Sequence, residues 1–150
     1  MSETLKIRPA GQDDIPALLP LIEALYQHEQ IAFDAIRIAD LLGSLIKQPD
    51  QGEVLLLDEG GQHAGYLVLT WCFSFEFGGR FGLLDELYVA PAFRSGGRAA
   101  VAIHAAIARC REKGAGALRL EVTEGNDRAA NVYRRHGFRT DPRRLMTLRL

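Results

Sequence analysis

The chain has 150 residues, of which 47% are hydrophobic and 25% are charged, and its formal net charge is −1 at pH 7. This length fits one domain spanning residues 1–150, with a core large enough to fold without disulfides or a structural metal. Basic and acidic residues are interleaved, which argues against a nucleic-acid-binding protein. The sequence opens without a signal-peptide pattern and has no bilayer-spanning apolar run, so we expect a cytoplasmic protein without membrane contact.

The first part of the chain is predicted to form one strand and two helices. Residues 4–8 alternate apolar and polar side chains, which is typical of a strand. Asp13 or Asp14 then caps a helix whose apolar positions recur at helical spacing as far as Tyr26. A second helix is expected from about Asp34 to Lys47, because its apolar side chains lie on one side and a proline follows.

Three consecutive strands are predicted next. Residues 53–58 and 64–73 are apolar, partly β-branched runs joined by a glycine-containing turn, which favours a hairpin. After a second glycine pair, residues 81–89 form a third apolar run that a proline ends. The three runs therefore predict a meander.

The last part of the chain predicts alternating helices and strands. Residues 99–113 are rich in alanine and stop at a glycine, as expected for a helix. Residues 117–122 are predicted to be a strand, residues 127–135 a helix, and residues 145–150 a terminal strand. The whole order β, α, α, β, β, β, α, β, α, β predicts an α/β fold of the α+β kind, with a mixed sheet and helices on its faces.

A glycine-rich turn stands between the third meander strand and the following helix, at residues 90–99. The first N–H groups of a helix have no intrahelical partner, and the helix dipole favours an anion there. Gly96 and Gly97 allow the backbone to approach that anion, and Arg94 and Arg98 add mobile positive charge. The turn predicts phosphate binding, although such turns also serve chain reversal alone, and it matches neither a P-loop nor a dinucleotide fingerprint.

Two segments together resemble the motifs of the GNAT superfamily of acyl-CoA-dependent N-acetyltransferases. Arg94, Gly97 and Ala99 match the signature (Gln/Arg)-x-x-Gly-x-(Gly/Ala), and residues 126–138 are similar to Asn-x-x-Ala-x-x-x-Tyr-x-x-x-Gly-Phe. The segments IRPAGQDD and DELYVAP also look like that superfamily, so the resemblance spans nearly the whole chain. It implies a GNAT-like splayed sheet of about six or seven strands with about four helices on its two faces.

The resemblance also implies an activity and a set of ligand-binding residues. The activity is transfer of an acetyl group from acetyl-CoA to a primary amine by direct attack in a ternary complex. Pantetheine is expected to pair with the splayed strand, where a free backbone N–H stabilises the oxyanion. The residues implied to bind acetyl-CoA are Leu87, Tyr88, Val89, Arg94, Ser95, Gly96, Gly97, Arg98, Ala99, Asn126, Ala129 and Tyr133.

Three side chains are candidates for the chemistry. An alkylamine with a pKa of about 10.4 must lose a proton before it attacks, so a base is required. Asp85 and Glu86 are the candidates, but they point to opposite faces of a regular strand unless a bulge intervenes, and the choice stays open. The resemblance assigns Tyr133 as proton donor to the leaving thiolate; the alternative is a core tyrosine with its hydroxyl hydrogen-bonded.

The acceptor amine is expected to bind near the first two helices. Tyr26, His28 and Glu29 supply hydrogen-bonding and acidic groups that suit a cationic amine. A small amine, polyamine, amino sugar, amino acid or protein amine all fit this pattern. Two other classes remain, a non-catalytic acyl-CoA-binding sensor and a phosphate-dependent partner-binding domain.

The remaining reactive and aromatic residues predict no further chemistry. Cys72 and Cys110 lack metal or redox spacing and are interpreted as reduced core residues, and the four histidines have no metal-ligand spacing. No metal is therefore expected. An alternating row of aromatics predicts either core packing or a contact in a homodimer, and consists of Trp71, Phe73, Phe75 and Phe77.

Overall fold

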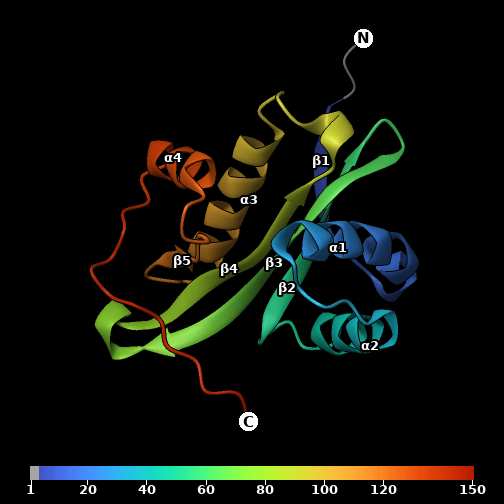
Figure 1. Cartoon of the computed structure of the whole chain (residues 1–150). Coiled ribbons are helices and arrows are strands. Elements are labelled where there is room, and N and C mark those ends of the chain that lie inside the picture. The colour runs from blue at the N-terminus through green and yellow to red at the C-terminus, as the bar shows by residue number, and fades with distance from the viewer. Residues whose placement is uncertain (1–3) are drawn as a thin grey trace.

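The computed structural model describes residues 4–150, which contain one mixed sheet of five strands in the order β1-β2-β3-β4-β5. Neighbouring strands are antiparallel except β4 and β5, which are parallel (Figure 1). The strands are β1 (Lys6–Pro9), β2 (Gly52–Glu59), β3 (Gln62–Ser74), β4 (Gly79–Val89) and β5 (Leu118–Leu120). The predicted meander and mixed sheet are therefore confirmed.

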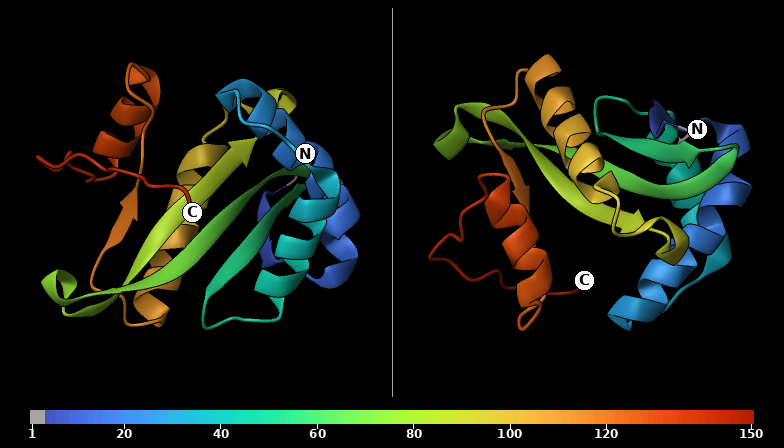
Figure 2. Two further views of the ribbon diagram at one scale, coloured as in Figure 1. Left: turned by 60° about the horizontal axis from the view of Figure 1, so that its bottom comes forward. Right: turned by 90° about the horizontal axis from the view of Figure 1, so that it is seen from above.

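Four α-helices surround this sheet. The helices are α1 (Ile15–Glu29), α2 (Ala35–Ile46), α3 (Arg98–Glu112) and α4 (Asp127–Arg135), with short 3-10 helices η1 (Gln12–Asp14), η2 (Phe75–Phe77) and η3 (Pro91–Phe93). Helices α1 and α2 cover one face and α3 covers the other, while α4 lies beyond β5 at that edge (Figures 1 and 2). The sheet thus separates two apolar layers.

Side-chain caps explain where two of the helices begin. The Asp34 Oδ1 accepts a hydrogen bond from the Arg37 N–H at 3.1 Å, before α2. The Asn126 Oδ1 accepts from the Ala129 N–H at 3.2 Å, before α4. Each bond satisfies one of the N–H groups that a helix start leaves unpaired.

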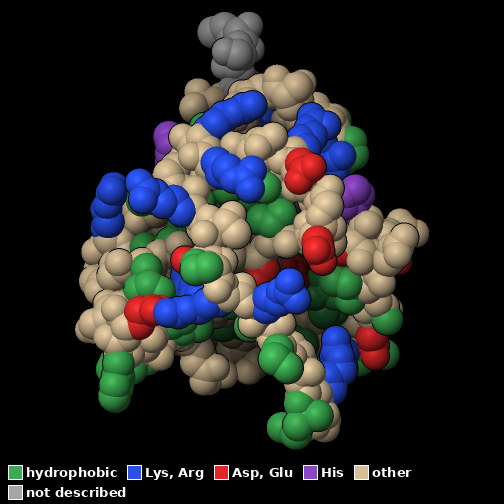
Figure 3. All heavy atoms as spheres, turned by 60° about the vertical axis from the view of Figure 1, so that its left-hand side comes forward, with side chains coloured by type: hydrophobic (Ala, Val, Ile, Leu, Met, Phe, Trp, Pro, Cys, Tyr) green, Lys and Arg blue, Asp and Glu red, His purple; other side chains and the backbone are tan. Residues whose placement is uncertain are grey.

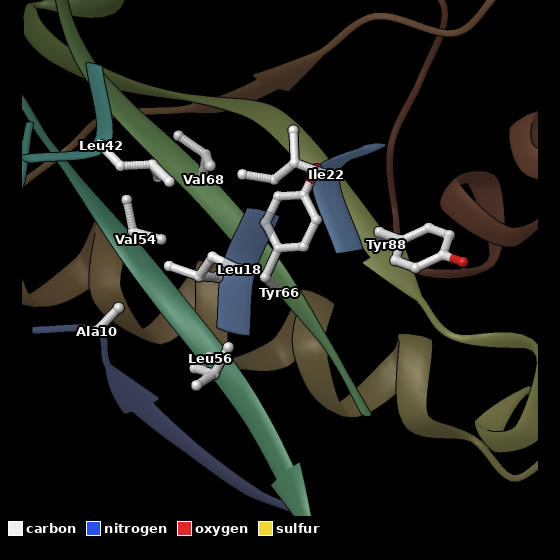
Figure 4. Close-up of a cluster of buried hydrophobic side chains, with 9 residues drawn as sticks. All are labelled: Ala10, Leu18, Ile22, Leu42, Val54, Leu56, Tyr66, Val68 and Tyr88. Atoms are coloured by element: carbon white, nitrogen blue, oxygen red, sulfur yellow. The ribbon is translucent and has the colours of Figure 1, made fainter. Parts of the chain in front are cut away.

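The two faces of the sheet bury separate clusters. Under α1 and α2, Leu18 and Ile22 point at Tyr66 of β3 (Figure 4), and none of the three is more than 2% exposed. Under α3, Ala102 and Ala106 pack on Leu67 and other inward residues of the sheet. Small side chains on α3 let that helix approach the strands closely.

Two predictions about the strands are wrong. Residues 145–150 form no strand, because they extend into solvent without a neighbouring strand, and the sheet of the described residues has five strands instead of six or seven. The aromatic row also ends early, since Phe75 and Phe77 lie in η2 and not in an extended strand. Phe73 and Phe75 are 73% and 93% exposed, so they are not core residues.

The described residues also bear on the expectations about membrane helices, metal sites and cysteines. Among residues 4–150, no helix is long and apolar enough to span a membrane. Within that range no cluster of His, Cys, Asp and Glu is arranged to hold a metal. Both cysteines are free, with Cys110 buried and Cys72 half-buried.

Candidate active site

The site is a pocket that opens where β4 and β5 separate. Their ladder pairs Gly82 to Leu84 with Leu118 to Leu120, and the rest of β4 has no ladder partner on that side within the described chain. The resulting cavity of about 390 Å³ is lined by Leu25, Tyr26, Glu29, Ile31, Leu84, Asp85, Glu86, Leu87, Leu120, Glu121, Val122, Thr123, Asn126, Ala129 and Tyr133. Residues from β4, α1 and α4 thus meet in one hollow.

A bulge in β4 lies at this point of divergence. Glu86 pairs with Val68 and Leu84 pairs with Leu69, so Asp85 is an extra residue with no partner on β3. A bulge of this kind breaks the alternation of side chains along a strand. Asp85 and Glu86 consequently both line the pocket, which a regular strand would not permit.

Two tyrosines hold the Glu86 carboxylate. The Tyr26 hydroxyl donates to Glu86 Oε2 at 2.8 Å, and the Tyr66 hydroxyl donates to Oε1 at 2.7 Å. Burial, together with the neighbouring Glu86 charge, raises the pKa of both phenols, so they remain donors at neutral pH. Glu86 is therefore fixed in orientation by both of its oxygens.

Asp85 is in a different environment. Within residues 4–150, no hydrogen bond or ion pair reaches its carboxyl group, and the residue is exposed. The surrounding protein nevertheless removes part of its hydration, and this desolvation raises the pKa of Asp85. The pocket thus contains one anchored carboxylate and one that is free to accept a proton.

Tyr133 lines the same pocket from α4. Its ring is half-buried and packs edge-on against Phe138, with centroids 5.7 Å apart. Burial, and secondarily the charge of Glu29, raises the pKa of the phenol. No hydrogen bond joins its hydroxyl to any other described residue, in contrast to the alternative of a hydrogen-bonded core tyrosine.

The charge of the pocket wall is negative. Among the described residues, the lining carries four carboxylates and no Lys, Arg or His; the carboxylates belong to Glu29, Asp85, Glu86 and Glu121. The Thr123 hydroxyl donates to Glu29 Oε2 at 3.2 Å, which joins α1 to the segment after β5. A cationic group is favoured in this cavity over an anionic one.

The glycine turn before α3 has the geometry of an anion site. Gly97 is the N-cap residue with φ 75°, and no side chain caps the N–H groups of the first helical turn. Ser95 also has a positive φ, 67°, in a region that L-residues seldom adopt. The uncapped N–H groups fit a phosphate at the N-terminus of a 15-residue helix.

The two arginines of the turn are held by other groups. The Arg94 Nε donates to the Val89 carbonyl at 2.9 Å. The Arg98 Nε and Nη2 both donate to Glu59 Oε2, at 2.9 Å and 2.7 Å. Arg98 is thus paired with a carboxylate, whereas Arg94 is exposed and is held to the backbone through its Nε, and the role of both in phosphate binding stays a prediction.

Comparison with known proteins identifies the family. The model of the acetyltransferase (GNAT) family matches residues 20–138, which include the pocket and the glycine turn. The chain belongs to the GNAT acetyltransferase family. It is accordingly an acetyl-CoA-dependent N-acetyltransferase, and the resemblance inferred from the paired motifs is confirmed.

Related proteins share the length and fold of this acetyltransferase. An uncharacterized N-acetyltransferase of Bacillus subtilis (strain 168), YhfO, is 26% identical over 137 residues, which are 91% of each chain. An integron cassette protein from the mobile metagenome of Cole Harbour Salt Marsh is 33% identical, with a TM-score of 0.86 over 96% of this chain and 90% of that one. A predicted acetyltransferase from Clostridium acetobutylicum, solved with acetyl-CoA, has the same fold, with a TM-score of 0.82, 16% identity and coverage of 97% and 96%.

The acetyltransferase pocket includes some residues named from the sequence and others that were missed. Tyr26 and Glu29 lie in the wall, whereas His28 is exposed on α1 outside it. Tyr66 was missed because a tyrosine in an apolar strand is typical of core packing, although a buried hydroxyl does require a partner. The apolar wall residue Leu25 carried no signal for this role, since only the fold brings α1 to β4.

Proposed function

We propose that this acetyltransferase acetylates a small cationic primary amine by direct attack within a ternary complex, with Asp85 as the proton acceptor. The observation that carries the proposal is the bulge at Asp85, where β4 leaves β5. It puts an unpaired carboxylate in the same pocket as the unbonded hydroxyl of Tyr133. The remaining features support particular parts of this assignment.

The acceptor class follows from charge and size. Four carboxylates line the cavity without a basic side chain, which attracts an ammonium group and repels an acidic substrate. The cavity of about 390 Å³ is at the small end of ligand pockets, and part of it must admit the acetyl end of the donor. Apolar side chains from Leu25 and Ile31 suit an alkyl chain beside the amine. A small aliphatic amine or polyamine fits better than an acidic amino acid.

Asp85 is the better base for two reasons. Its carboxyl group has no hydrogen-bond or ion-pair partner among residues 4–150, so a substrate ammonium or a water can approach it. Its raised pKa moves it towards the operating pH, where a general base is most effective. Glu86 already accepts two phenol hydrogen bonds, so we assign it to orienting the cationic amine by charge.

Binding of the acetyl donor, acetyl-CoA, is assigned to the glycine turn and to the free edge of β4. The uncapped N–H groups at Gly97 and after it suit the pyrophosphate of acetyl-CoA. The unpaired edge of β4 at Leu87 to Val89 offers backbone groups to a pantetheine chain and an oxyanion. Tyr133, with a pKa raised by burial, is protonated at neutral pH and can return a proton to the leaving sulfur. Acetyl-CoA itself supplies the activated acetyl group.

A free-thiol release assay across an amine panel tests the proposal. The panel holds aliphatic diamines and polyamines, aminoglycosides, neutral and acidic amino acids, and peptides. We expect turnover with the small cationic amines and little with acidic amino acids. Acetylation of an acidic amino acid in preference to every polyamine would contradict the acceptor class.

Matched variants test the roles of the side chains. Asp85→Asn is expected to lower kcat by about 100-fold or more, the usual contribution of a general base. Glu86→Gln also keeps the shape of the side chain and removes one negative charge, and it should chiefly raise the KM for the amine. Tyr133→Phe should lower kcat by about 100-fold while acetyl-CoA affinity, measured by calorimetry, stays the same. If Glu86→Gln were the variant that abolishes kcat, the assignment of the base would be reversed.

A further inference from the structure

An ion pair between Glu59 and Arg98 joins the end of β2 to the glycine turn. Two N–H groups on one edge of the guanidinium, Nε and Nη2, converge on Glu59 Oε2. The side chains of Glu59 and Arg98 are 14% and 27% exposed, so water and salt screen this pair less than a pair at the open surface. The guanidinium also lies over the Phe93 ring, 5.7 Å from its centroid. The head of Arg98 is therefore held in one orientation.

The third nitrogen of this guanidinium, Nη1, lies over Gly96. A Cβ added to Gly96 would fall on Nη1. The φ of Gly96 lies outside the left-handed region, so the guanidinium, and not that torsion, excludes a side chain there. Among residues 4–150, Nη1 has no hydrogen-bond acceptor, because both bonds of the head come from its other edge. Its N–H groups are therefore available to a ligand at the turn.

The place of Arg98 in the helix calls for an anion. Arg98 is the first residue of α3, where the helix dipole disfavours a positive charge, and no side chain caps the N–H groups of this turn. Glu59 offsets part of the charge from one side. A second anion at the turn would be stabilised by the helix N–H groups and by Nη1 together.

The surface around the turn favours the approach of an anion. At the level of the glycine turn, near the top of Figure 1, the face drawn in Figure 3 carries more Lys and Arg than acidic side chains. Such a surplus attracts an anionic ligand. Acetyl-CoA, the co-substrate of this acetyltransferase family, contains a pyrophosphate that supplies this charge.

We propose that Glu59 is a positioning residue for acetyl-CoA, because it holds Arg98 with Nη1 directed over Gly96 towards the pyrophosphate. This assignment rests on the proposed binding of acetyl-CoA at the glycine turn. Glu59 acts through the guanidinium and does not itself contact the ligand. Without the carboxylate, the flexible arginine must be ordered when acetyl-CoA binds, and this ordering costs conformational entropy. Glu59 thus pays that cost during folding.

A second ion pair of the same kind provides a matched control. Further along α3, the Arg109 Nε and Nη2 both donate to Glu53 Oε1. Glu53 and Glu59 lie near the two ends of β2, so each pair ties α3 to the same strand. Loss of either pair removes an anchor of α3. Only loss of Glu59 changes the orientation of a guanidinium at the glycine turn.

Calorimetry with acetyl-CoA tests the proposal on variants that keep side-chain shape. Arg98→Met should weaken binding about 10-fold or more, because a charge-assisted hydrogen bond is lost. Glu59→Gln should weaken binding about 5-fold, because the guanidinium remains but must be ordered. In the Arg98→Met background, Glu59→Gln should have no further effect on affinity. Glu53→Gln should lower Tm and leave the Kd for acetyl-CoA unchanged.

Steady-state kinetics give a second readout. In Glu59→Gln the KM for acetyl-CoA should rise with the Kd while kcat stays the same, because the reacting groups on β4 and α4 are left in place. A fall in kcat at unchanged KM would contradict the positioning role.

The outcomes separate this proposal from the binding of acetyl-CoA itself. Equal affinity of wild type and Glu59→Gln would overturn the positioning role and leave the assignment of the turn intact. An equal loss of affinity in Glu59→Gln and Glu53→Gln would also overturn it, since the effect would then come from the anchoring of α3. Tighter binding by Glu59→Gln would show that the carboxylate repels the pyrophosphate, which is the opposite of the proposal. A wild type that binds no acetyl-CoA would instead refute the assignment of the turn, and the role of Glu59 with it.

Discussion

The hydrogen bond from Tyr66 to Glu86 should be worth a measurable part of the folding free energy. Tyr66 is fully buried, and its hydroxyl donates to Glu86 Oε1 at 2.7 Å. Tyr66→Phe keeps the ring that packs on Leu18 and Ile22 and removes only the hydroxyl. The change therefore isolates one charge-assisted hydrogen bond.

The expected magnitude can be worked from this geometry. A hydrogen bond to a charged group contributes about 1.5–3 kcal/mol. Glu86 is half-buried and keeps the Tyr26 hydroxyl as a second donor, and water from the pocket can replace part of the loss. We therefore expect Tyr66→Phe to lower the unfolding free energy by about 1–2 kcal/mol, which for this length is a Tm decrease of about 2–8 °C.

Chemical denaturation of four proteins tests the reasoning as a double-mutant cycle. The proteins are wild type, Tyr66→Phe, Glu86→Gln and the double variant. If the hydroxyl acts through the carboxylate, Tyr66→Phe costs clearly less in the Glu86→Gln background than in wild type. An equal cost in both backgrounds would refute the explanation, since the hydroxyl would then act through packing alone.

The same network predicts a loss of stability in alkali. Burial, followed by the influence of Glu86, raises the folded-state pKa of Tyr26 and Tyr66 above the ordinary value of about 10. A raised pKa means that the unfolded chain releases these protons first. The stabilisation is thus complete below about pH 10 and declines as the pH rises further. In urea unfolding, the variant with both Tyr26→Phe and Tyr66→Phe should lose less stability above pH 10 than wild type does.

The remaining predictions concern stability and thiol reactivity. A Cβ on Gly65 would collide with the β4 backbone, so Gly65→Ala should lower the free energy of unfolding in urea by more than about 2 kcal/mol. A Cβ on Gly43 in α2 would meet mainly a flexible side chain, so Gly43→Ala should be neutral or slightly stabilising in the same assay. Hydrogen bonds from Arg8 lower the pKa of Asp14 to about 2 from 3.8, so Asp14→Asn should be less stable than wild type at pH 7. When Tm is measured at decreasing pH, the difference in Tm between the two proteins should vanish as the pH falls from 3.8 to about 2. Burial raises the pKa of Cys110 to about 11 and leaves the residue 5% exposed, so alkylation of this thiol at neutral pH should require unfolding and should speed up as urea is added.

Local signals in the sequence located most elements of the fold. The helix at Asp127–Arg135 has the bounds predicted from its sequence, because an asparagine cap and a following glycine define both ends. Helix α2 was located instead from apolar side chains on one side and a following proline, and the structure adds the side-chain cap of Asp34. Each of these signals acts within a few residues, so the rest of the fold does not alter it.

The site depended on long-range geometry that no local pattern contains. Tyr26 and Glu86 are 60 residues apart and meet only because α1 crosses β4. The bulge at Asp85 was recognised as a condition for both carboxylates to share a pocket, but its presence depends on how β4 registers with β3. Tyr66 was not considered, since its partner is known only once the strands are paired.

The short β5 connects the pocket with the failed prediction of a terminal strand. On its inner side, β5 pairs with only three residues of β4, and the pocket opens where that pairing stops. On its outer side it leaves the edge that the alternating pattern of residues 145–150 would complete. That pattern records a side-chain period and carries no information on which chain supplies the neighbour.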